Sequence, residues 1–188
     1  MEEKTTGLLL QAIPYLERQK ILKVLTAEHG LLTLVGDRKT SSILSSPFVL
    51  AEWVYKTSAR SMYPLKDGTL LDDLRSLKEN FSRLTSAGQM ASDLLKTQLP
   101  GKNAAEPLDL TLACLRKLPL FTQPMVLNAT FRLKLLLCEG MLHEEELVSP
   151  YLKTLGLSRS FQELASLPFN TEEIDKANVL FEQRFNYA

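Results

Sequence analysis

Residues 30–42 read GLLTLVGDRKTSS, an apolar segment that runs directly into a polar loop. Gly30 tolerates a positive φ and follows Glu28 and His29, so these three residues predict a turn and residues 31–35 predict a strand. With a second strand expected at residues 21–26, the segment predicts a β-hairpin. The loop that follows carries two adjacent cations, Arg38 and Lys39, and it is either a nucleic-acid contact or a solvated turn.

Further short apolar segments surround this hairpin. Residues 6–13 form an apolar run that ends at Pro14, residues 47–56 are rich in aromatic and β-branched side chains, and residues 60–71 contain Pro64 and the pair Asp67-Gly68. Each pattern is typical of a strand with an adjoining turn. Five short strands over residues 1–71 predict a small closed barrel, because closure removes exposed sheet edges.

After residue 71 the apolar residues recur at spacings of three and four, which predicts an amphipathic helix over residues 71–94. Further helices are expected after Pro107, over residues 125–138 with Gly140 as the C-cap, over residues 144–155 and 160–167, and from Thr171 onward, where the Thr171 hydroxyl is expected to cap the helix. The expected fold is therefore α+β, with a five-stranded barrel at residues 1–71 and an all-α helical domain at residues 72–188.

The charges of the chain balance, with 22 Lys and Arg against 22 Asp and Glu. No global positive field therefore draws the protein to nucleic acid or anionic lipid, and any such binding must be local. The acidic N-terminus and the lack of a long apolar run predict a cytoplasmic protein with no membrane partner. Cys114 and Cys138 lie in apolar helical contexts and are expected to be buried free thiols.

Catalytic patterns are scarce in this sequence. His143-Glu144 begins an H-E-x-x-H pattern, but position 147 is Leu, so the second metal ligand is missing. The sequence has no phosphate-cradling glycine loop and no nucleophile elbow, and it contains only two histidines. We therefore expect no enzyme, no cofactor and no metal site.

The order of these segments resembles the bacterial recombination mediator family RecO. Residues 7–15, GLLLQAIPY, are similar to the family's opening strand and its following tyrosine. The turn at residues 28–30, the glycine and basic loop at residues 36–39, and the pair Pro47-Phe48 fall where the family has similar features. Residues 131–140, FRLKLLLCEG, resemble the family's central helix and its closing glycine.

This resemblance implies an N-terminal OB-fold that binds single- and double-stranded DNA, followed by a helical domain. It also implies a mediator that anneals complementary strands, binds the acidic, hydrophobic-ended tail of single-stranded-DNA-binding protein (SSB), and works with RecR to load RecA. Many members carry a four-cysteine zinc site after the glycine that matches Gly140. Residues 141–146 offer only His143, so the chain resembles a member without zinc.

Eight residues are candidates for DNA contacts. Arg38 and Lys39 are the first candidates for phosphate contacts, and the other cations that would extend a positive strip are Arg18, Lys20, Lys23 and Arg60. Tyr15 and Tyr63 each adjoin a proline and are candidates for stacking on bases. Phe48 and Trp53 are predicted to pack in the core.

Four cations of the helical half are candidates for binding a partner's acidic peptide: Arg116, Lys117, Arg132 and Lys134. Their alternative role is a structural ion pair or a snorkelling side chain. The sequence thus predicts a RecO-like recombination mediator that is associated with the nucleoid and has no catalytic residue. The alternative is an interaction scaffold with the same architecture that has largely lost DNA binding.

Overall fold

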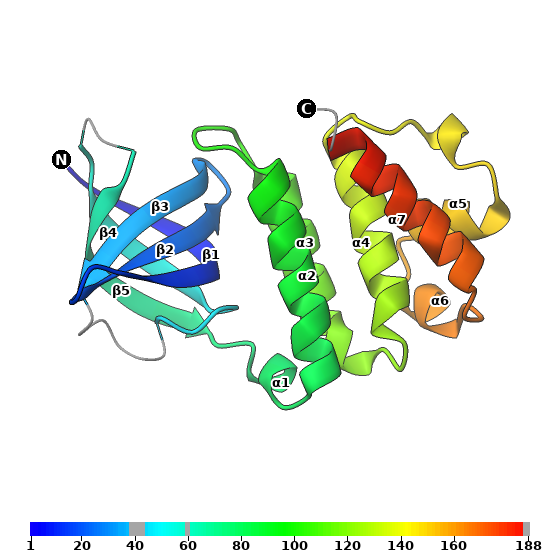
Figure 1. Ribbon diagram of the computed structural model, residues 1–188, viewed down its shortest axis with the longest axis horizontal. Helices are drawn as coiled ribbons and strands as arrows, with labels where there is room; N and C mark the ends of the chain where they lie inside the picture. Colours follow the sequence, from blue (N-terminus) through cyan, green and yellow to red (C-terminus); the bar gives the residue numbers. More distant parts are fainter. Residues whose placement is uncertain (38–43, 59–60, 186–188) are drawn as a thin grey trace. The chain divides into compact units, whose positions relative to one another are not determined.

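The computed structural model describes residues 1–37, 44–58 and 61–185. Its N-terminal part contains five strands, which wind into a barrel drawn in blue to cyan-green in Figure 1. The strands are β1 Glu2–Tyr15, β2 Gln19–Thr26, β3 Gly30–Asp37, β4 Leu50–Lys56 and β5 Tyr63–Asp72.

The barrel closes in the order β1-β2-β3-β5-β4. All neighbouring strands are antiparallel except β3 and β5, which pair in parallel through Leu34 with Tyr63 and Val35 with Pro64. This is the five-stranded barrel of an OB-fold, and it confirms both the predicted hairpin and the α+β class. Strand β1 is longer than predicted because it pairs first with β4 and then with β2, with a register shift between Leu9 and Gln11.

The barrel core is built from alternate residues of each strand. Leu22 and Val24 of β2 face it, and the other members include Leu9, Leu32, Leu34, Val49, Ala51, Trp53 and Tyr55. Trp53 is fully buried, and its indole Nε1 donates a hydrogen bond of 3.0 Å to the carbonyl of Gly7. Phe48 is buried as well, so the core role predicted for both aromatic residues is confirmed.

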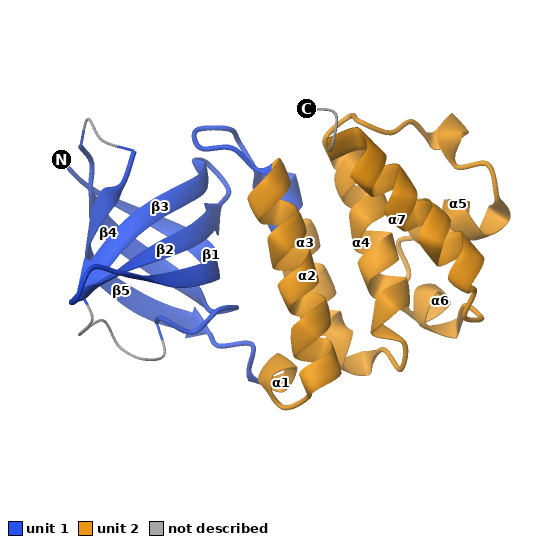
Figure 2. Cartoon of the chain, viewed as in Figure 1, with its two compact units in different colours: residues 1–75, 98–108 blue, residues 76–97, 109–188 orange. Residues whose placement is uncertain are grey.

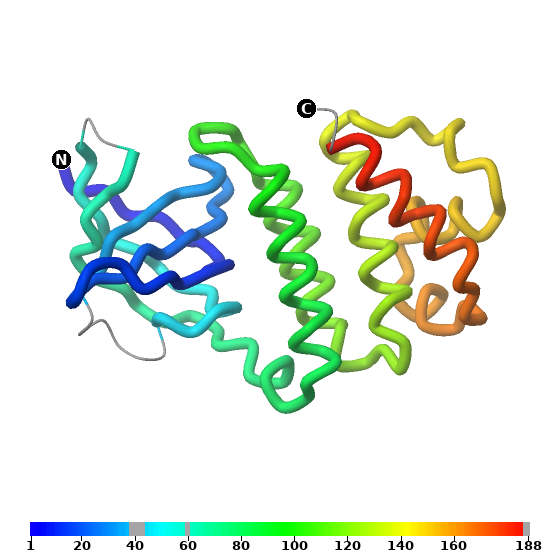
Figure 3. Tube along the Cα trace, viewed as in Figure 1, coloured from blue at the N-terminus to red at the C-terminus, as the bar shows by residue number. Residues whose placement is uncertain are grey.

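The turn between β2 and β3 is held by a distant segment, residues 98–104 (Figure 3). The Leu31 amide donates to the carbonyl of Leu99, and the Gly101 amide donates to the carbonyl of His29. Gly30 has a φ of 62°, and a Cβ there would lie 2.3 Å from the Leu99 carbonyl oxygen. Glycine is therefore required both by the backbone conformation and by the close approach of this segment.

The rest of the chain is helical. Its helices are α1 Arg75–Lys78, α2 Phe81–Thr97, α3 Ala105–Lys117, α4 Pro124–Cys138, α5 Pro150–Leu157, α6 Phe161–Ser166 and α7 Thr171–Phe185, with 3-10 turns η1 Leu118–Leu120 and η2 Glu144–Glu146. Helix α4 is apolar on most faces and contacts α2, α5 and α7. Gly140 follows it with a φ of 67°, as expected of a residue in the C-cap region.

The prediction of a single helix over residues 71–94 was wrong about where the helix begins. Strand β5 continues to Asp72, and the Asp72 and Asp73 carboxylates accept hydrogen bonds from the amides of Leu74 and Arg75, which turns the chain into the short α1. Asn80 then caps α2 by accepting from the Arg83 amide. Apolar residues recur at spacings of three and four across these caps as well. Periodicity alone therefore does not show that capping side chains end one element and begin the next.

Two further helix predictions are corrected. Residues 144–155 form a 3-10 turn and then α5, because Pro150 begins a new helix behind the N-cap Ser149. The predicted cap of the last helix was also wrong, since the Asn170 side chain, rather than Thr171, accepts the Glu173 amide.

The chain divides into two compact units, residues 1–75 with 98–108, and residues 76–97 with 109–188 (Figure 2). No helix within the described ranges is long and apolar enough to cross a bilayer. Neither cysteine forms a disulfide bond, and only Cys114 is buried, so the burial expected of Cys138 was wrong. Cys138, the last residue of α4, is exposed.

Candidate nucleic-acid interface

OB-folds bind oligonucleotides on the face of strands 2 and 3 and in the loops that join strands 1–2 and 4–5. In this chain that region contains a pocket of about 560 Å³. Its lining comes from the β1–β2 turn, β3, the β4–β5 connection and β5: Tyr15, Leu16, Gln19, Val35, Ser58, Met62 and Pro64. We call it the loop pocket. Its walls are mainly apolar, so its chemistry suits a flat, weakly polar group such as a base better than a phosphate.

Leu16 is the least shielded apolar residue of the loop pocket. It lies in the β1–β2 turn with a φ of 52° and is 73% exposed. A leucine held in this conformation without burial is unusual, because the left-handed region disfavours a branched side chain. Sequence reasoning missed Leu16 and Met62, and the signal that could have found Leu16 is an apolar residue set between Pro14-Tyr15 and a charged turn.

The described cations around this pocket do not form one strip. Arg18 is exposed in the β1–β2 turn, and Lys20 is half-buried on β2 beside it. Lys20 shares the strand face of the core residue Leu22, whereas Lys23 lies on the opposite face, because side chains alternate along a strand. The Lys23 ammonium donates a hydrogen bond of 2.9 Å to the Thr33 hydroxyl. The sequence predicted this strand only from residue 21, so the face of Lys20 was not assigned.

Three of the predicted DNA contacts, Arg38, Lys39 and Arg60, lie outside the described residues. The last described residue before the first pair is Asp37, which is exposed at the end of β3 and pairs across the sheet with Gln19. Asp37 precedes the two cations in the sequence and carries the opposite charge.

Tyr63 does not share the loop pocket with Tyr15. Its ring lies 5.5 Å from the ring of Tyr55, centroid to centroid, with a tilt of 38° between them, and it packs against the barrel core. The two tyrosines proposed for base stacking therefore belong to different surfaces.

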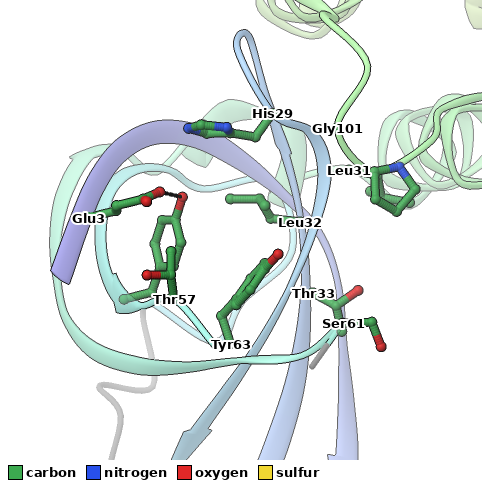
Figure 4. Close-up of a pocket in the computed structure, with 11 residues that line it drawn as sticks. Glu3, His29, Leu31, Leu32, Thr33, Thr57, Ser61, Tyr63 and Gly101 are labelled. Carbon is green, nitrogen blue, oxygen red and sulfur yellow. Dashed lines mark hydrogen bonds between the residues drawn. The ribbon is translucent and has the colours of Figure 1, made fainter. Parts of the chain in front are cut away.

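Tyr63 lines a second pocket of about 380 Å³, shown in Figure 4. Polar groups from several elements surround it, including Glu3, His29, Thr33, Thr57 and Ser61. The Tyr55 hydroxyl donates a hydrogen bond of 2.9 Å to the Glu3 carboxylate. Burial, and then this carboxylate, raise the pKa of Tyr55, so its hydroxyl stays protonated and keeps donating at neutral pH.

Arg132, a candidate for peptide binding, is buried in the second unit. Its Nε and Nη2 donate hydrogen bonds of 2.8 and 3.0 Å to the two carboxylate oxygens of Asp93, and Nη1 donates at 3.0 Å to Asn178. Its guanidinium carbon lies 5.0 Å from the centroid of the Phe181 ring. Burial raises the pKa of the Asp93 carboxyl and the guanidinium opposes that shift. These contacts match the structural ion pair, the alternative role considered for this residue.

The other three helical cations have different surroundings. The Lys134 ammonium donates a hydrogen bond of 2.7 Å to the Ser158 carbonyl, and burial lowers its pKa. Arg116 and Lys117 are exposed in the last turn of α3.

Asp93, which sequence reasoning missed, was signalled only by its position next to Leu94 on the apolar stripe of α2. Among the described residues, no group of three or more His, Cys, Asp or Glu side chains could hold a metal ion.

Residues 1–74 match the family model for the N-terminal domain of recombination protein O. DNA repair protein RecO of Acaryochloris marina is 31% identical over 112 residues, which cover 57% of this chain and 38% of that protein. The RecO of Bacillus pumilus is 27% identical over 143 residues, covering 73% and 56%. The RecO of Chlamydia muridarum is 26% identical over 184 residues, covering 94% and 77%.

The chain thus spans between about two fifths and just over half of the length of the first two relatives. The family model covers the whole barrel, and the longer matches continue through the helices. The barrel's strand order and these matches together support membership of this chain in the RecO family.

Proposed function

We propose that this chain acts in DNA repair as a RecO-type recombination mediator, binding single- and double-stranded DNA and promoting the annealing of complementary strands. It assists RecA loading together with RecR and SSB, at the nucleoid in the cytoplasm, and it works by binding without a catalytic step. The observation that carries this proposal is the barrel in OB strand order whose residues 1–74 match the RecO N-terminal domain.

DNA binds on the barrel, which we assign to residues 1–71, at the face of the loop pocket. Tyr15 stacks on a base there, and Arg18 and Lys20, from the same turn and the start of β2, contact phosphates. Arg38, Lys39 and Arg60, which lie outside the described residues, add further phosphate contacts. Lys23 contributes charge from the other face of β2, where Thr33 holds its ammonium.

This binding is weak at physiological salt, because few phosphates are neutralised. The chain carries no net charge, and Asp37 adjoins the two loop cations. The slope of log affinity against log salt is about −0.7 for each phosphate contacted on a single strand, so a shallow slope is expected. Annealing suits weak contacts, since the protein must release the duplex that it helps to form.

The helical domain, which we assign to residues 72–188, receives the protein partners. Arg116 and Lys117 are exposed at the C-terminus of α3 and supply cations for the acidic tail of SSB. Lys134 is less accessible because its ammonium is bound to the Ser158 carbonyl. Residues 98–108, which are the α2–α3 connection and the first turn of α3, group with the barrel unit, although they lie in the helical part of the sequence.

The first experiment is a fluorescence-anisotropy titration of labelled single-stranded DNA at two salt concentrations. Wild-type protein is compared with Arg38→Ala/Lys39→Ala, with Arg18→Ala/Lys20→Ala, and with Lys153→Ala, a control at an exposed cation on α5. Salt-sensitive binding that weakens in both double variants and not in the control supports the proposal. An annealing assay with two complementary oligonucleotides, run on the same proteins, tests the activity itself.

The second candidate is an interaction scaffold of the same fold that has largely lost DNA binding. The neutral net charge and the bound Lys23 favour it. Wild-type protein that fails to bind either single- or double-stranded DNA at low salt, yet retains the SSB tail peptide, would establish the scaffold instead.

A further inference from the structure

The second unit contains an apolar groove that the proposed DNA-binding role does not use. It has a volume of about 450 Å³ and lies between α5, α7 and the segment that enters α5. Leu152 is buried at its base, whereas Val148 is 81% exposed and Val179 is 52% exposed. Exposed apolar side chains that line a concave surface are typical of a site that another molecule covers.

The groove is bordered by carboxylates. Its lining contains Glu146, Glu172 and Asp175 against one ammonium, that of Lys176. This ammonium is already shared, because it lies 2.8 Å from Glu172 and 2.8 Å from Glu173. Four carboxylates, those of Glu146, Glu172, Glu173 and Asp175, thus stand against two cations, Lys176 and the Arg184 that pairs with Glu146, so the rim carries a net negative charge.

The residues next to the groove are also negatively charged. Glu144 and Glu145 are exposed in the neighbouring turn η2. The carboxylate of Glu146 is bound by Arg184 and also accepts a hydrogen bond of 2.8 Å from the His143 amide, which fixes it in place. A partner that covers the apolar surface must bring cations to these carboxylates, since a like charge placed opposite them is repelled.

We propose that this groove is a docking site for a basic amphipathic segment of a partner protein. Apolar side chains at helical spacing cover Val148 and Val179, and flanking Lys or Arg side chains pair with Glu172 and Asp175. An acidic peptide, such as the SSB tail assigned to Arg116 and Lys117, is excluded from this groove by its charge. The surface is separate from the DNA-binding face and calls for a different class of partner.

Two labelled probes test the proposal by fluorescence anisotropy. One is an amphipathic peptide of leucine and lysine with its leucines at helical spacing, and the other has glutamate in place of every lysine. Wild-type protein is expected to bind the lysine peptide, more tightly at low salt, and to leave the glutamate peptide free. Equal binding of the two probes, or binding of neither, overturns the proposal.

Paired variants locate the site. Glu172→Gln/Asp175→Asn removes two charges of the rim and is expected to weaken binding about threefold to tenfold. The matched control is Glu106→Gln/Asp109→Asn, which removes two exposed acids with the same spacing from the start of α3 and leaves affinity unchanged. Equal affinities in wild type and the rim variant contradict the assigned site.

The apolar part is tested with Val148→Asp/Val179→Asp, at residues whose exposure makes the substitution harmless to the core. Binding is expected to fall at least about tenfold, with an unchanged circular-dichroism melting curve. Sedimentation equilibrium tests the other possible occupant of the groove, a second copy of this chain. A wild-type dimer that this variant abolishes would mean that a second copy fills the groove, which overturns the proposal.

Discussion

The guanidinium of Arg132 on α4 and the carboxylate of Asp93 on α2 form a buried bidentate ion pair, with N···O distances of 2.8 and 3.0 Å. The same guanidinium contacts Asn178 and the Phe181 ring, both on α7. One side chain thus joins three helices of the second unit. Both charges are removed from water, so each needs the other to offset its desolvation. Removing one partner is therefore expected to destabilise the folded state strongly, because the remaining charge stays buried.

Asp93→Ala is expected to reduce the free energy of unfolding by about 3–5 kcal/mol, because the buried Arg132 guanidinium then keeps only the more distant and partly exposed Glu182 carboxylate, at 3.6 Å. Urea denaturation followed by circular dichroism measures this loss. The double variant Asp93→Leu/Arg132→Met, which removes both charges and keeps the volume, is expected to recover most of it. A double variant less stable than Asp93→Ala would show that the ion pair itself, rather than an uncompensated charge, dominates.

Tyr15 and Tyr63 are expected to differ in their effect on DNA binding. Tyr15→Ala removes the ring from the loop pocket and is expected to cost about 1–3 kcal/mol of affinity for single-stranded DNA, the range for one stacked base. Anisotropy titration measures the change.

Conservative variants at both positions serve as controls for this prediction. Tyr15→Phe keeps the ring and is expected to bind as wild type, and so is Tyr63→Phe, because the Tyr63 ring packs against Tyr55 and the barrel core. A loss of affinity in Tyr63→Ala that equals the loss in Tyr15→Ala, in protein with an unchanged circular-dichroism spectrum, would place a stacking site in the second pocket instead.

The two thiols are expected to react at very different rates. Cys138 is exposed, whereas Cys114 is buried, and burial raises the pKa of the Cys114 thiol to about 12. Since the thiolate is the reactive form, a thiol reagent should modify one cysteine quickly and the second only when the protein is unfolded. Absorbance at neutral pH counts the fast thiol, and Cys138→Ser is expected to remove it. Fast labelling that persists in Cys138→Ser would contradict the burial of Cys114.

The raised pKa of Cys114 also predicts an effect on stability. Its ordinary value lies near 9.0 and the folded value is about 12, so between these pH values the unfolded chain loses a proton that the folded chain keeps. The unfolded state then binds fewer protons, and the free energy of unfolding falls as pH rises through this window. The measurement is urea denaturation from pH 8 to about pH 11 on wild type and Cys114→Ala. Cys114→Ala is expected to be less stable at pH 8, but its free energy of unfolding should fall less steeply as pH rises. If the two proteins lose stability in parallel, the Cys114 thiol is not the cause of the pH dependence.

The sequence predicted the barrel well because its strands have local signals. Gly30 fixes the β2–β3 turn, Pro14 lies near the end of β1, and alternation identifies which side chains of β2 can share a face. The prediction from sequence was wrong where a capping side chain sets the boundary of an element, as Asp72 does. It also missed contacts with distant segments, such as the hydrogen bonds from residues 98–104 to the turn at Gly30. Lys20 lay outside the strand expected at residues 21–26, so alternation was not applied to it and its separation from Lys23 was missed. The separation of Tyr15 from Tyr63 depends on how distant strands pair, which the sequence does not show.

Gly30→Ala is expected to destabilise the barrel by at least about 2 kcal/mol, from the left-handed conformation and the clash together. The residue has a φ of 62°, and an added Cβ would lie 2.3 Å from the carbonyl oxygen of Leu99 and 2.5 Å from that of Lys102. Gly88→Ala is the matched control, because a Cβ at this position in α2 meets nothing within 4 Å and alanine favours a helix interior, so stability should rise slightly. Thermal and urea denaturation measure both changes. If Gly30→Ala were as stable as wild type, the contact between residues 98–104 and the β2–β3 turn would not constrain the barrel.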